Sequence, residues 1–402
     1  MDVPLDNDAT VEPESAVADP SFPGLLTQTV DLAAVRHNIG AIKKAARSRK
    51  LMAVVKADGY SQGAAEVACA ALQGGADQLG VATLRESLDL RESLELRGTS
   101  ATILAWLWHP DEALDLDAAV ASGVQVGVPS AEHLDAVIAA GARANVRPRV
   151  TAIADTGLNR SGICVVDGTF ARVAADFAEA HLRGEINVTG VASHLACADE
   201  PDNSANDMQA DRFRRAASEL AEAGIAHQLN HLSNSPASLT RPDLSFDMVR
   251  PGLAVYGLEP VAGRDHGLRP VMRWEARIPV IKDVAAGEAV SYGRTWVAER
   301  DTRTAIIPCG YADGMLRSAS GKFDVSINGV RYPQVGRVCM DQFVVDLGPD
   351  APVRTGDVAV IVGTRDGEPT ADELAAAAGT INYEILTAPG GRTRRRHVGG
   401  RD

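Results

Sequence analysis

The sequence predicts a (β/α)8 TIM-like barrel followed by a mainly β C-terminal domain. From Leu51 onward, the chain repeats an apolar strand of five to eight residues followed by an amphipathic helix. This unit occurs eight times within about 200 residues. After about residue 266 it gives way to short strands joined by Gly and Asp turns. Eight alternating units favour a closed parallel barrel over an open doubly wound sheet.

Eight segments are the expected barrel strands. The strand candidates are 51–56, 78–83, 102–106, 124–128, 147–154, 186–193, 227–231 and 246–250, and all but 227–231 are largely apolar. The last of these has the weakest strand pattern. Between the strands, residues 84–96 place leucines at helical spacing, and Ser130 can cap a helix over 130–140.

The second domain is expected to be built from short strands. Candidate segments are 272–281, 304–309, 323–332 and 358–362. Within 323–332, Asn328-Gly329 is a strong signal for a hairpin turn, because both positions of such a turn need positive φ. We therefore place the barrel domain at residues 27–265 and the β domain at residues 266–390.

Both ends of the chain are expected to lie outside these domains. Residues 1–26 contain six acidic side chains, four prolines and no Lys or Arg. Such a segment buries too little apolar surface to offset its ordering entropy, so it is predicted to be a disordered acidic tail. Residues 391–402 are predicted to be a basic C-terminal tail.

Composition excludes several classes of function. The 402 residues carry a formal net charge of -13, which argues against a nucleic-acid partner. No apolar stretch approaches the roughly 18 residues of a membrane span. The five cysteines are odd in number, scattered and never spaced as Cys-x-x-Cys, which argues against disulfides and against a metal site. We expect a cytoplasmic protein with reduced thiols and a small polar substrate.

Polar residues follow five of the expected strands at their carboxyl ends. These are Lys56 and Tyr60, the segment 155–160, His194, Asn234 with Ser235, and Arg250 with Gly252. In a barrel these ends form the catalytic face, and the loops after the seventh and eighth strands usually bind phosphate. A lysine on this face is placed to form a Schiff base with a carbonyl group or with pyridoxal phosphate.

Each of these residues also has a structural interpretation. Lys56 on its own is most often a solvated strand end, and Asn234 and Ser235 can simply cap a short helix. His194 alone is more often a hydrogen-bonded core residue, and Arg250 can be a surface end cap. Their coincidence on one face favours a site over four independent structural roles.

Nine short stretches, in order between about residues 27 and 388, resemble the bacterial, pyridoxal-phosphate-dependent alanine racemases of fold type III. They are A-V-V-K-A-D-G-Y (53–60), A-D-T-G-L-N-R-S-G (154–162), S-H-L-A-C-A-D-E (193–200), S-N-S-P-A (233–237), R-P-G-L-A-V-Y-G (250–257), S-Y-G-R-T-W (291–296), G-Y-A-D-G (310–314), G-R-V-C-M-D-Q (336–342) and I-N-Y-E-I-L (381–386). Any one string is weak, but nine in order are highly specific.

The resemblance implies a two-base racemisation of alanine that supplies D-alanine for peptidoglycan. Lys56 would hold pyridoxal 5'-phosphate covalently and act as one base. Tyr292 would be the other base, approaching Cα from the opposite face. Racemisation needs both, because a proton removed from one face must be returned to the other. Tyr292 would come from the second subunit of a head-to-tail homodimer, so a monomer should be inactive.

The resemblance also implies roles for the remaining residues. Arg250 would face the pyridine nitrogen, where a cation disfavours ring protonation. The other cofactor-binding residues would be Tyr60, His194, Asn234, Ser235, Gly252 and Tyr383. Substrate would be bound by Arg160, Met340, Asp341 and Tyr311.

Two departures from the family pattern leave alternatives open. Ile153 stands where the family usually has a lysine, often carbamylated, that holds the carboxylate-binding arginine, so weaker substrate affinity is expected. Ser61-Gln62-Gly63 replaces the customary Gly-His-Gly. The alternatives are a racemase of altered or broader specificity, or a non-catalytic pyridoxal-phosphate-binding homologue. Retention of Tyr292 and Met340 argues against the last.

Overall fold

The structure is a computed structural model that describes residues 24–48, 50–226 and 228–400. Most of the predicted acidic tail, residues 1–23, lies outside the described residues. The chain divides into two compact units. The barrel unit contains Thr29–Met272, Asn382–Thr387 and the described residues from Arg395 onward. The β unit contains Arg273–Ile381, Ala388–Arg394 and the described residues up to Gln28.

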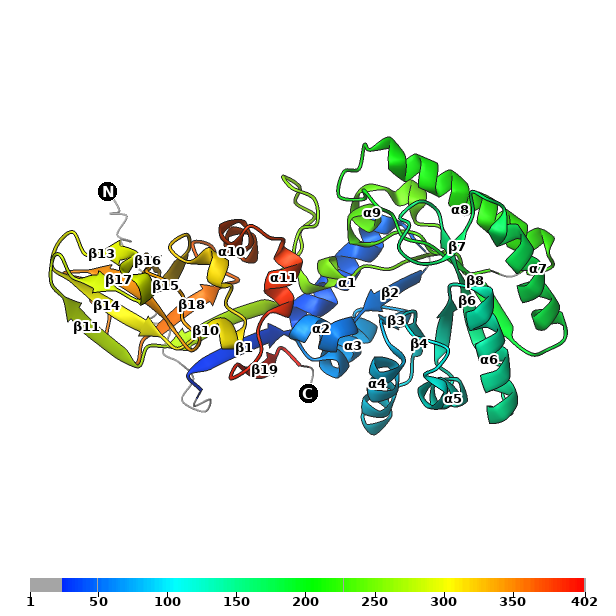
Figure 1. Cartoon of the computed structure of the whole chain (residues 1–402), viewed down its shortest axis with the longest axis horizontal. Helices are drawn as coiled ribbons and strands as arrows, with labels where there is room; N and C mark the ends of the chain where they lie inside the picture. The colour runs from blue at the N-terminus through cyan, green and yellow to red at the C-terminus, as the bar shows by residue number, and fades with distance from the viewer. Residues whose placement is uncertain (1–23, 49, 227, 401–402) are drawn as a thin grey trace, which may run out of the picture. The chain divides into compact units, whose positions relative to one another are not determined.

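Parallel strands form the centre of the barrel unit, as the sequence predicts (Figure 1). Neighbouring strands pair in the order β2 (Lys50–Val54), β3 (Gln78–Val81), β4 (Thr102–Ala105), β5 (Gln125–Val128), β6 (Arg149–Asp155) and β8 (Asn187–Ala192). The two-residue strand β7 (Ile163–Cys164) pairs with β6, and β9 (Met248–Val249) pairs with β2.

The seventh barrel position is an extended segment rather than a full strand. His231 forms an isolated parallel bridge with Ala192. On its other side, the amide of Asp247 donates to Asn230 O (3.1 Å) and the amide of Arg250 donates to Ser233 O (2.8 Å). These bonds link β8 through this segment to β9, so the ring of strands closes and the predicted (β/α)8 barrel is confirmed.

Helices surround these strands (Figure 1). They are α1 (Leu32–Ala46), α3 (Ala64–Gln73), α4 (Leu84–Leu96), α5 (Ala113–Ala121), α6 (Ala131–Ala144), α7 (Thr169–Leu182), α8 (Ser204–Glu222) and α9 (Ser235–Thr240). Helix α4 has the predicted bounds and buries Leu84, Leu90 and Leu94. Ser130 caps α6 as predicted, because its side chain accepts from the amide of His133.

Short apolar strands with both faces covered are typical of a parallel barrel. All four residues of β3 and all four of β5 are buried. Inside the ring, Met52, Leu104 and Met248 form a buried cluster against which Trp106 packs. Within the described residues, no helix is long and apolar enough to cross a membrane.

Antiparallel strands form the β unit. Their order is β11 (Val280–Val284), β14 (Thr302–Ile307), β17 (Phe343–Gly348), β16 (Val330–Val335), β15 (Asp324–Ile327), β18 (Val358–Val362) and β10 (Met272–Arg277). Asn328 and Gly329 join β15 to β16 with φ of 52° and 79°, the left-handed pair that the predicted hairpin requires. Helix α10 (Ala371–Ala378) completes the unit.

Two further strands run across the division between the units. Strand β1 (Leu26–Asp31) lies at the start of the described chain, and β19 (Arg394–Val398) lies near its end. Residues 394–398 of the predicted basic tail therefore have strand structure.

Candidate active site

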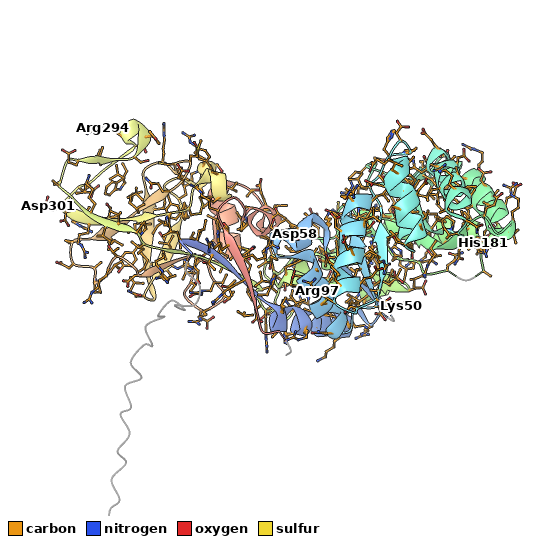
Figure 2. All side chains as sticks on the ribbon, turned by 90° about the horizontal axis from the view of Figure 1, so that it is seen from below. Lys50, Asp58, Arg97, His181, Arg294 and Asp301 are labelled. Carbon is orange, nitrogen blue, oxygen red and sulfur yellow. The ribbon has the colours of Figure 1, made fainter. Side chains whose placement is uncertain are left out.

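Lys56 follows strand β2 and opens an unusual turn, α2 (Lys56–Ser61). Residues 57–61 all have φ between 51° and 63°, so the chain makes a left-handed helical turn here. Each non-glycine residue in this conformation costs about 1–2 kcal/mol. Backbone strain of this kind persists only where surrounding contacts impose it, and it clusters at functional sites. Figure 2 labels Asp58, whose carboxylate caps the turn by accepting from the amide of Ala64 (3.0 Å).

Burial tunes the amine of Lys56 for nucleophilic chemistry. The pKa of Lys56 is lowered from its ordinary value, first by burial and then by the positive charge of Arg160. Glu86 opposes this shift. The net effect enlarges the neutral fraction of the amine, which is the form that attacks a carbonyl group and accepts a proton.

Arg250 is the buried cation of the site. Its Nη1 donates to His231 Nδ1 (2.8 Å) and to His231 O, while Nη2 donates to Ser193 O and to Leu232 O (3.3 Å). Burial lowers the pKa of Arg250 to about 10, so it remains charged at neutral pH. Arginine has five donors, and Nε–H is the one that finds no acceptor among the described residues.

Two histidines near Arg250 are held neutral. Burial, reinforced by Arg250, lowers the pKa of His231 well below its ordinary value. Burial likewise lowers the pKa of His194 to about 3, with further contributions from Arg250, Arg160 and Lys56. The three cations therefore all act on the one imidazole of His194.

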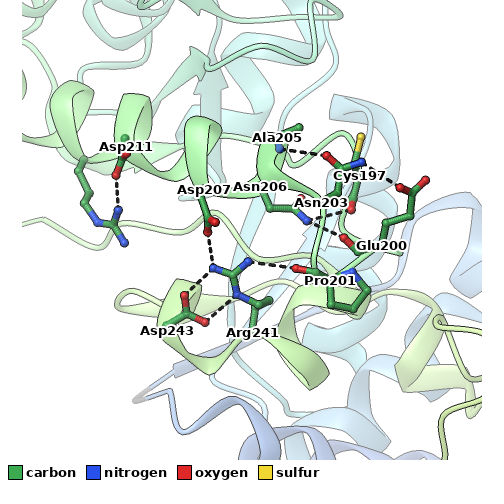
Figure 3. Close-up of polar contacts among 11 residues, drawn as sticks. Cys197, Glu200, Pro201, Asn203, Ala205, Asn206, Asp207, Asp211, Arg241 and Asp243 are labelled. Carbon is green, nitrogen blue, oxygen red and sulfur yellow. Dashed lines mark hydrogen bonds and ion pairs between the residues drawn. The ribbon is translucent and has the colours of Figure 1, made fainter.

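The loop that carries His194 is held by the start of helix α8 (Figure 3). Asn206 donates to the carbonyls of Cys197 (3.0 Å) and Glu200 (2.9 Å). Arg241 donates to Pro201 O (3.1 Å) and pairs with both Asp207 and Asp243. Closer to the site, Gln209 donates to His194 O (3.0 Å). These bonds fix the backbone on which the imidazole is mounted.

The loops after the seventh and eighth barrel positions meet at Ser235. Its Oγ accepts from the amides of Gly252 (2.9 Å) and Ala254 (3.2 Å), which leaves the hydroxyl hydrogen to donate elsewhere. The neighbouring Asn234 caps a short helix, which was the structural interpretation of this residue. Its side chain accepts from the amide of Ala237 (3.4 Å) at the start of α9.

Tyr60 brings a second hydroxyl to the same place. A Cβ atom built on Gly252 would lie 2.3 Å from Tyr60 Oη. The ring of Tyr60 packs on Tyr256 with centroids 4.5 Å apart. Burial raises the pKa of Tyr60 above its ordinary value, so the hydroxyl keeps its proton and can donate. Tyr383, on α11 (Asn382–Thr387), also contributes to this shift, and burial raises its own pKa to about 12.

These residues fit pyridoxal phosphate. A side-chain-free cradle at Gly252 is bordered by two hydroxyl donors, Tyr60 and Ser235, which suit a phosphate dianion. The unused Nε–H of Arg250 suits an unprotonated ring nitrogen, and the amine of Lys56 suits an aldehyde.

Tyr292 and three of the predicted substrate-binding residues, Tyr311, Met340 and Asp341, lie in the β unit. Tyr292 is in the 3-10 turn η3 (Tyr292–Arg294) and is 70% exposed. Ser291 precedes it with φ of 66° and donates from Oγ to Arg337 O (2.7 Å). Arg294, at the end of this turn, is labelled in Figure 2.

A second pair of loops in the β unit carries Tyr311, Met340 and Asp341. The amide of Tyr311 donates to Cys339 O (3.1 Å), and the amide of Ala312 donates to Met340 O (3.0 Å). Arg392 ties Asp341 (2.7 Å) to the buried Asp313 (2.7 Å). The structure thus brings these three predicted residues together within one unit.

Two known domain families match the chain. Alanine racemase, N-terminal domain, matches residues 30–260, and alanine racemase, C-terminal domain, matches residues 271–397. The chain belongs to the alanine racemase family.

Similar proteins match along almost their whole length. An alanine racemase of Mycolicibacterium vanbaalenii is 47% identical over 385 residues, covering 94% of this chain and 95% of the relative. One from Mycobacterium tuberculosis is 47% identical over 377 residues, covering 93% and 96%. The crystal structure of alanine racemase from D-cycloserine-producing Streptomyces lavendulae superposes with a TM-score of 0.89 at 42% identity, covering 94% and 98%. That from Corynebacterium glutamicum has a TM-score of 0.81 at 44% identity, covering 93% and 100%.

Ile153, where the resemblance implied a lysine, is an aliphatic residue of this alanine racemase family member. Ile153 lies on β6, and its Cδ1 would be 3.1 Å from a Cβ atom built on Gly127. Its aliphatic side chain cannot hydrogen-bond an arginine. Arg160 is exposed, and in the part of the chain that the structure describes its guanidinium has no hydrogen bond or ion pair.

Sequence reasoning missed three residues that shape this site. His231 accepts a hydrogen bond from Arg250, Tyr256 supports the ring of Tyr60, and Glu86 acts on Lys56. His231 stood within a predicted strand, and Glu86 within a predicted helix. Neither position by itself signals a contact with a loop elsewhere in the chain.

Proposed function

We propose that this enzyme interconverts L-alanine and D-alanine, with pyridoxal 5'-phosphate as cofactor and with Lys56 and Tyr292 as two bases. The observation that carries the proposal is the convergence of Lys56, Arg250 and His194 at the carboxyl ends of the barrel strands, beside the hydroxyl-lined cradle at Gly252. The similar enzymes are named alanine racemases, after this activity.

When bound, the cofactor supplies an electron sink that acidifies the Cα hydrogen of the amino acid. Arg250 would hold the ring nitrogen through its remaining donor, Nε–H. Because Arg250 stays charged with a pKa of about 10, it disfavours a proton on that nitrogen. The neutral His194 adds no charge next to the ring. Tyr60 and Ser235 donate to the phosphate.

The two bases serve opposite faces of Cα. Lys56, with its lowered pKa, takes or returns the proton on one face, and Tyr292 does so on the other. Arg160 holds the substrate carboxylate through its planar fork, with Met340, Asp341 and Tyr311 beside it.

We further propose a head-to-tail homodimer in which the second subunit supplies Tyr292. This is supported by the exposure of Tyr292 (70%), Met340 (53%) and Tyr311 (45%), since large side chains with a binding role are not expected to face water in the working enzyme. The five free cysteines agree with a reducing, cytoplasmic setting, where D-alanine would be made for peptidoglycan.

Exchange of the Cα hydrogen in deuterated water tests the two-base assignment. Lys56→Ala should lose the visible absorbance of the covalently bound cofactor. Tyr292→Phe should keep the cofactor but slow exchange selectively from one enantiomer, by two orders of magnitude or more.

Two matched variants serve as controls. Lys50→Ala changes an exposed lysine at the start of β2, and Tyr332→Phe changes a buried tyrosine on β16. Both should behave as wild type. Equal slowing of both enantiomers by Tyr292→Phe would show that the tyrosine does not serve one face.

A further inference from the structure

Glu86 joins the ends of two neighbouring barrel strands. It lies in the first turn of α4, and its Oε1 accepts from the amide of Ala57 (2.8 Å), the residue after Lys56. Its Oε2 accepts from the amides of Ala82 (2.8 Å) and Thr83 (3.1 Å), which follow β3. One half-buried carboxylate thus binds three backbone amides from two loops.

These bonds differ in what they support. The bond to Thr83 belongs to a capping box, in which Thr83 also accepts from the amide of Glu86 (3.2 Å). A capping box needs nothing beyond its own helix. The bond to Ala57 is outside that motif, and Ala57 is the first residue of the left-handed turn, with φ of 53°.

Glu86 is also the anion that acts on the Lys56 amine. Arg160 and burial lower the pKa of Lys56, whereas Glu86 raises it. The nearby His194 is buried and neutral, with a pKa of about 3. Replacement of the carboxylate by an amide would therefore remove the charge that raises the pKa of Lys56 and leave the charge of Arg160, which lowers it.

We propose that Glu86 is a positioning residue for Lys56, holding the Ala57 amide so that the left-handed turn aims the lysine, and placing one negative charge beside its amine. This inference rests on the proposed role of Lys56 as the cofactor-binding base. Charged hydrogen bonds to amides are roughly twice as strong as neutral ones, which suits a group that must hold a strained turn.

Reattachment of the cofactor separates charge from tethering. The full-length enzyme is stripped of cofactor with hydroxylamine, pyridoxal phosphate is added back, and the rate of covalent attachment is followed across pH. Glu86→Gln should move the rise of this profile to lower pH, because Lys56 then loses its proton more readily. It should also lower the plateau rate about tenfold, because an amide cannot hold all three N–H groups as a carboxylate does.

Glu86→Asp and Thr83→Ala complete the set. Glu86→Asp keeps the charge but is one methylene shorter, so it should retain the wild-type pH profile with a reduced plateau. Thr83→Ala removes the other half of the capping box and leaves the Ala57 bond, so it should change neither profile nor plateau while lowering the melting temperature.

The outcomes distinguish this inference from the proposed function. If Glu86→Gln matches Thr83→Ala in profile and plateau, Glu86 is only a helix cap and the inference is overturned. If Glu86→Gln does not fold, a wild-type plateau in Glu86→Asp overturns the tethering role. Covalent attachment that persists in Lys56→Ala would instead refute the proposed function, whatever Glu86 does.

Discussion

Gly252→Ala is a sharp test of the cofactor cradle, because the obstacle to a side chain there is one residue, Tyr60. Gly252 has φ of -110°, so it does not lie in the left-handed region that only glycine adopts readily. Its Cβ would lie 2.3 Å from Tyr60 Oη and 3.2 Å from Tyr60 Cζ. Ordinary contact begins near 3.4 Å, so the hydroxyl must move by about 1 Å.

Tyr60 has little freedom to make that movement. Its backbone belongs to the left-handed turn, and its buried ring packs on Tyr256. Overpacking of this kind costs about 1–3 kcal/mol of folding stability. A displaced hydroxyl would also lose its proposed bond to the charged phosphate, worth about 1.5–3 kcal/mol, which would weaken cofactor affinity about ten- to a hundredfold.

A double-mutant cycle with Tyr60→Phe isolates the contact. Urea unfolding of the cofactor-free protein measures stability, and fluorescence titration measures pyridoxal phosphate affinity. In the Tyr60→Phe background the clashing hydroxyl oxygen is gone. Gly252→Ala should then lower the free energy of unfolding by less than about 1 kcal/mol and barely change the affinity for pyridoxal phosphate. Equal costs in the two backgrounds would refute the reasoning, because the clash would then lie elsewhere.

Two further changes test the electrostatics and the altered family position. His194 has a folded pKa of about 3, far below its ordinary value of 6.5, so the unfolded chain binds the proton more tightly and stability falls as pH drops below about 6.5. At pH 4.5 the loss in the free energy of unfolding amounts to about 2–3 kcal/mol. His194→Gln should reduce this loss, measured as the difference between urea unfolding at pH 7 and at pH 4.5. An unchanged loss would contradict the burial of a neutral imidazole. Ile153→Lys should lower the KM for alanine severalfold with little change in kcat, because a lysine can help to hold Arg160. The control Ile153→Met should leave the KM unchanged. An unaltered KM in Ile153→Lys would show that Arg160 is held well without a lysine.

Periodicity predicted the barrel because the hydrophobic spacing of each strand and helix is visible in its own short stretch of sequence. Helix α4 begins and ends at the predicted residues, and β18 does as well. The seventh strand was overestimated, since among its described residues, 228–231, His231 forms an isolated bridge and the others have no strand structure. Leu229 is the one apolar residue among its described positions, and ladder bonds depend on how closely β8 and β9 approach from either side.

Strand ends also predicted most of the candidate site. Lys56, His194 and Arg250 follow the first, sixth and eighth expected strands, and a barrel necessarily gathers the carboxyl ends of its strands on one face. Asn234 was ambiguous in the sequence because one side chain can cap a helix or bind a ligand. Its bond to the Ala237 amide shows the cap, and its role toward the cofactor stays a prediction.

The sequence by itself determined the order of the elements, the face on which the chemistry-bearing residues lie and, through nine ordered stretches, the family. Only the tertiary structure decided how those residues are tuned. The left-handed turn after Lys56 has no signal in the sequence pattern. The approach of Tyr60 to Gly252 and the bond from the Ala57 amide to Glu86 join residues that no local pattern connects. The physical reason is that periodicity reports which side of an element is buried, whereas a pKa or a 2.8 Å bond depends on which atoms from other elements meet it there.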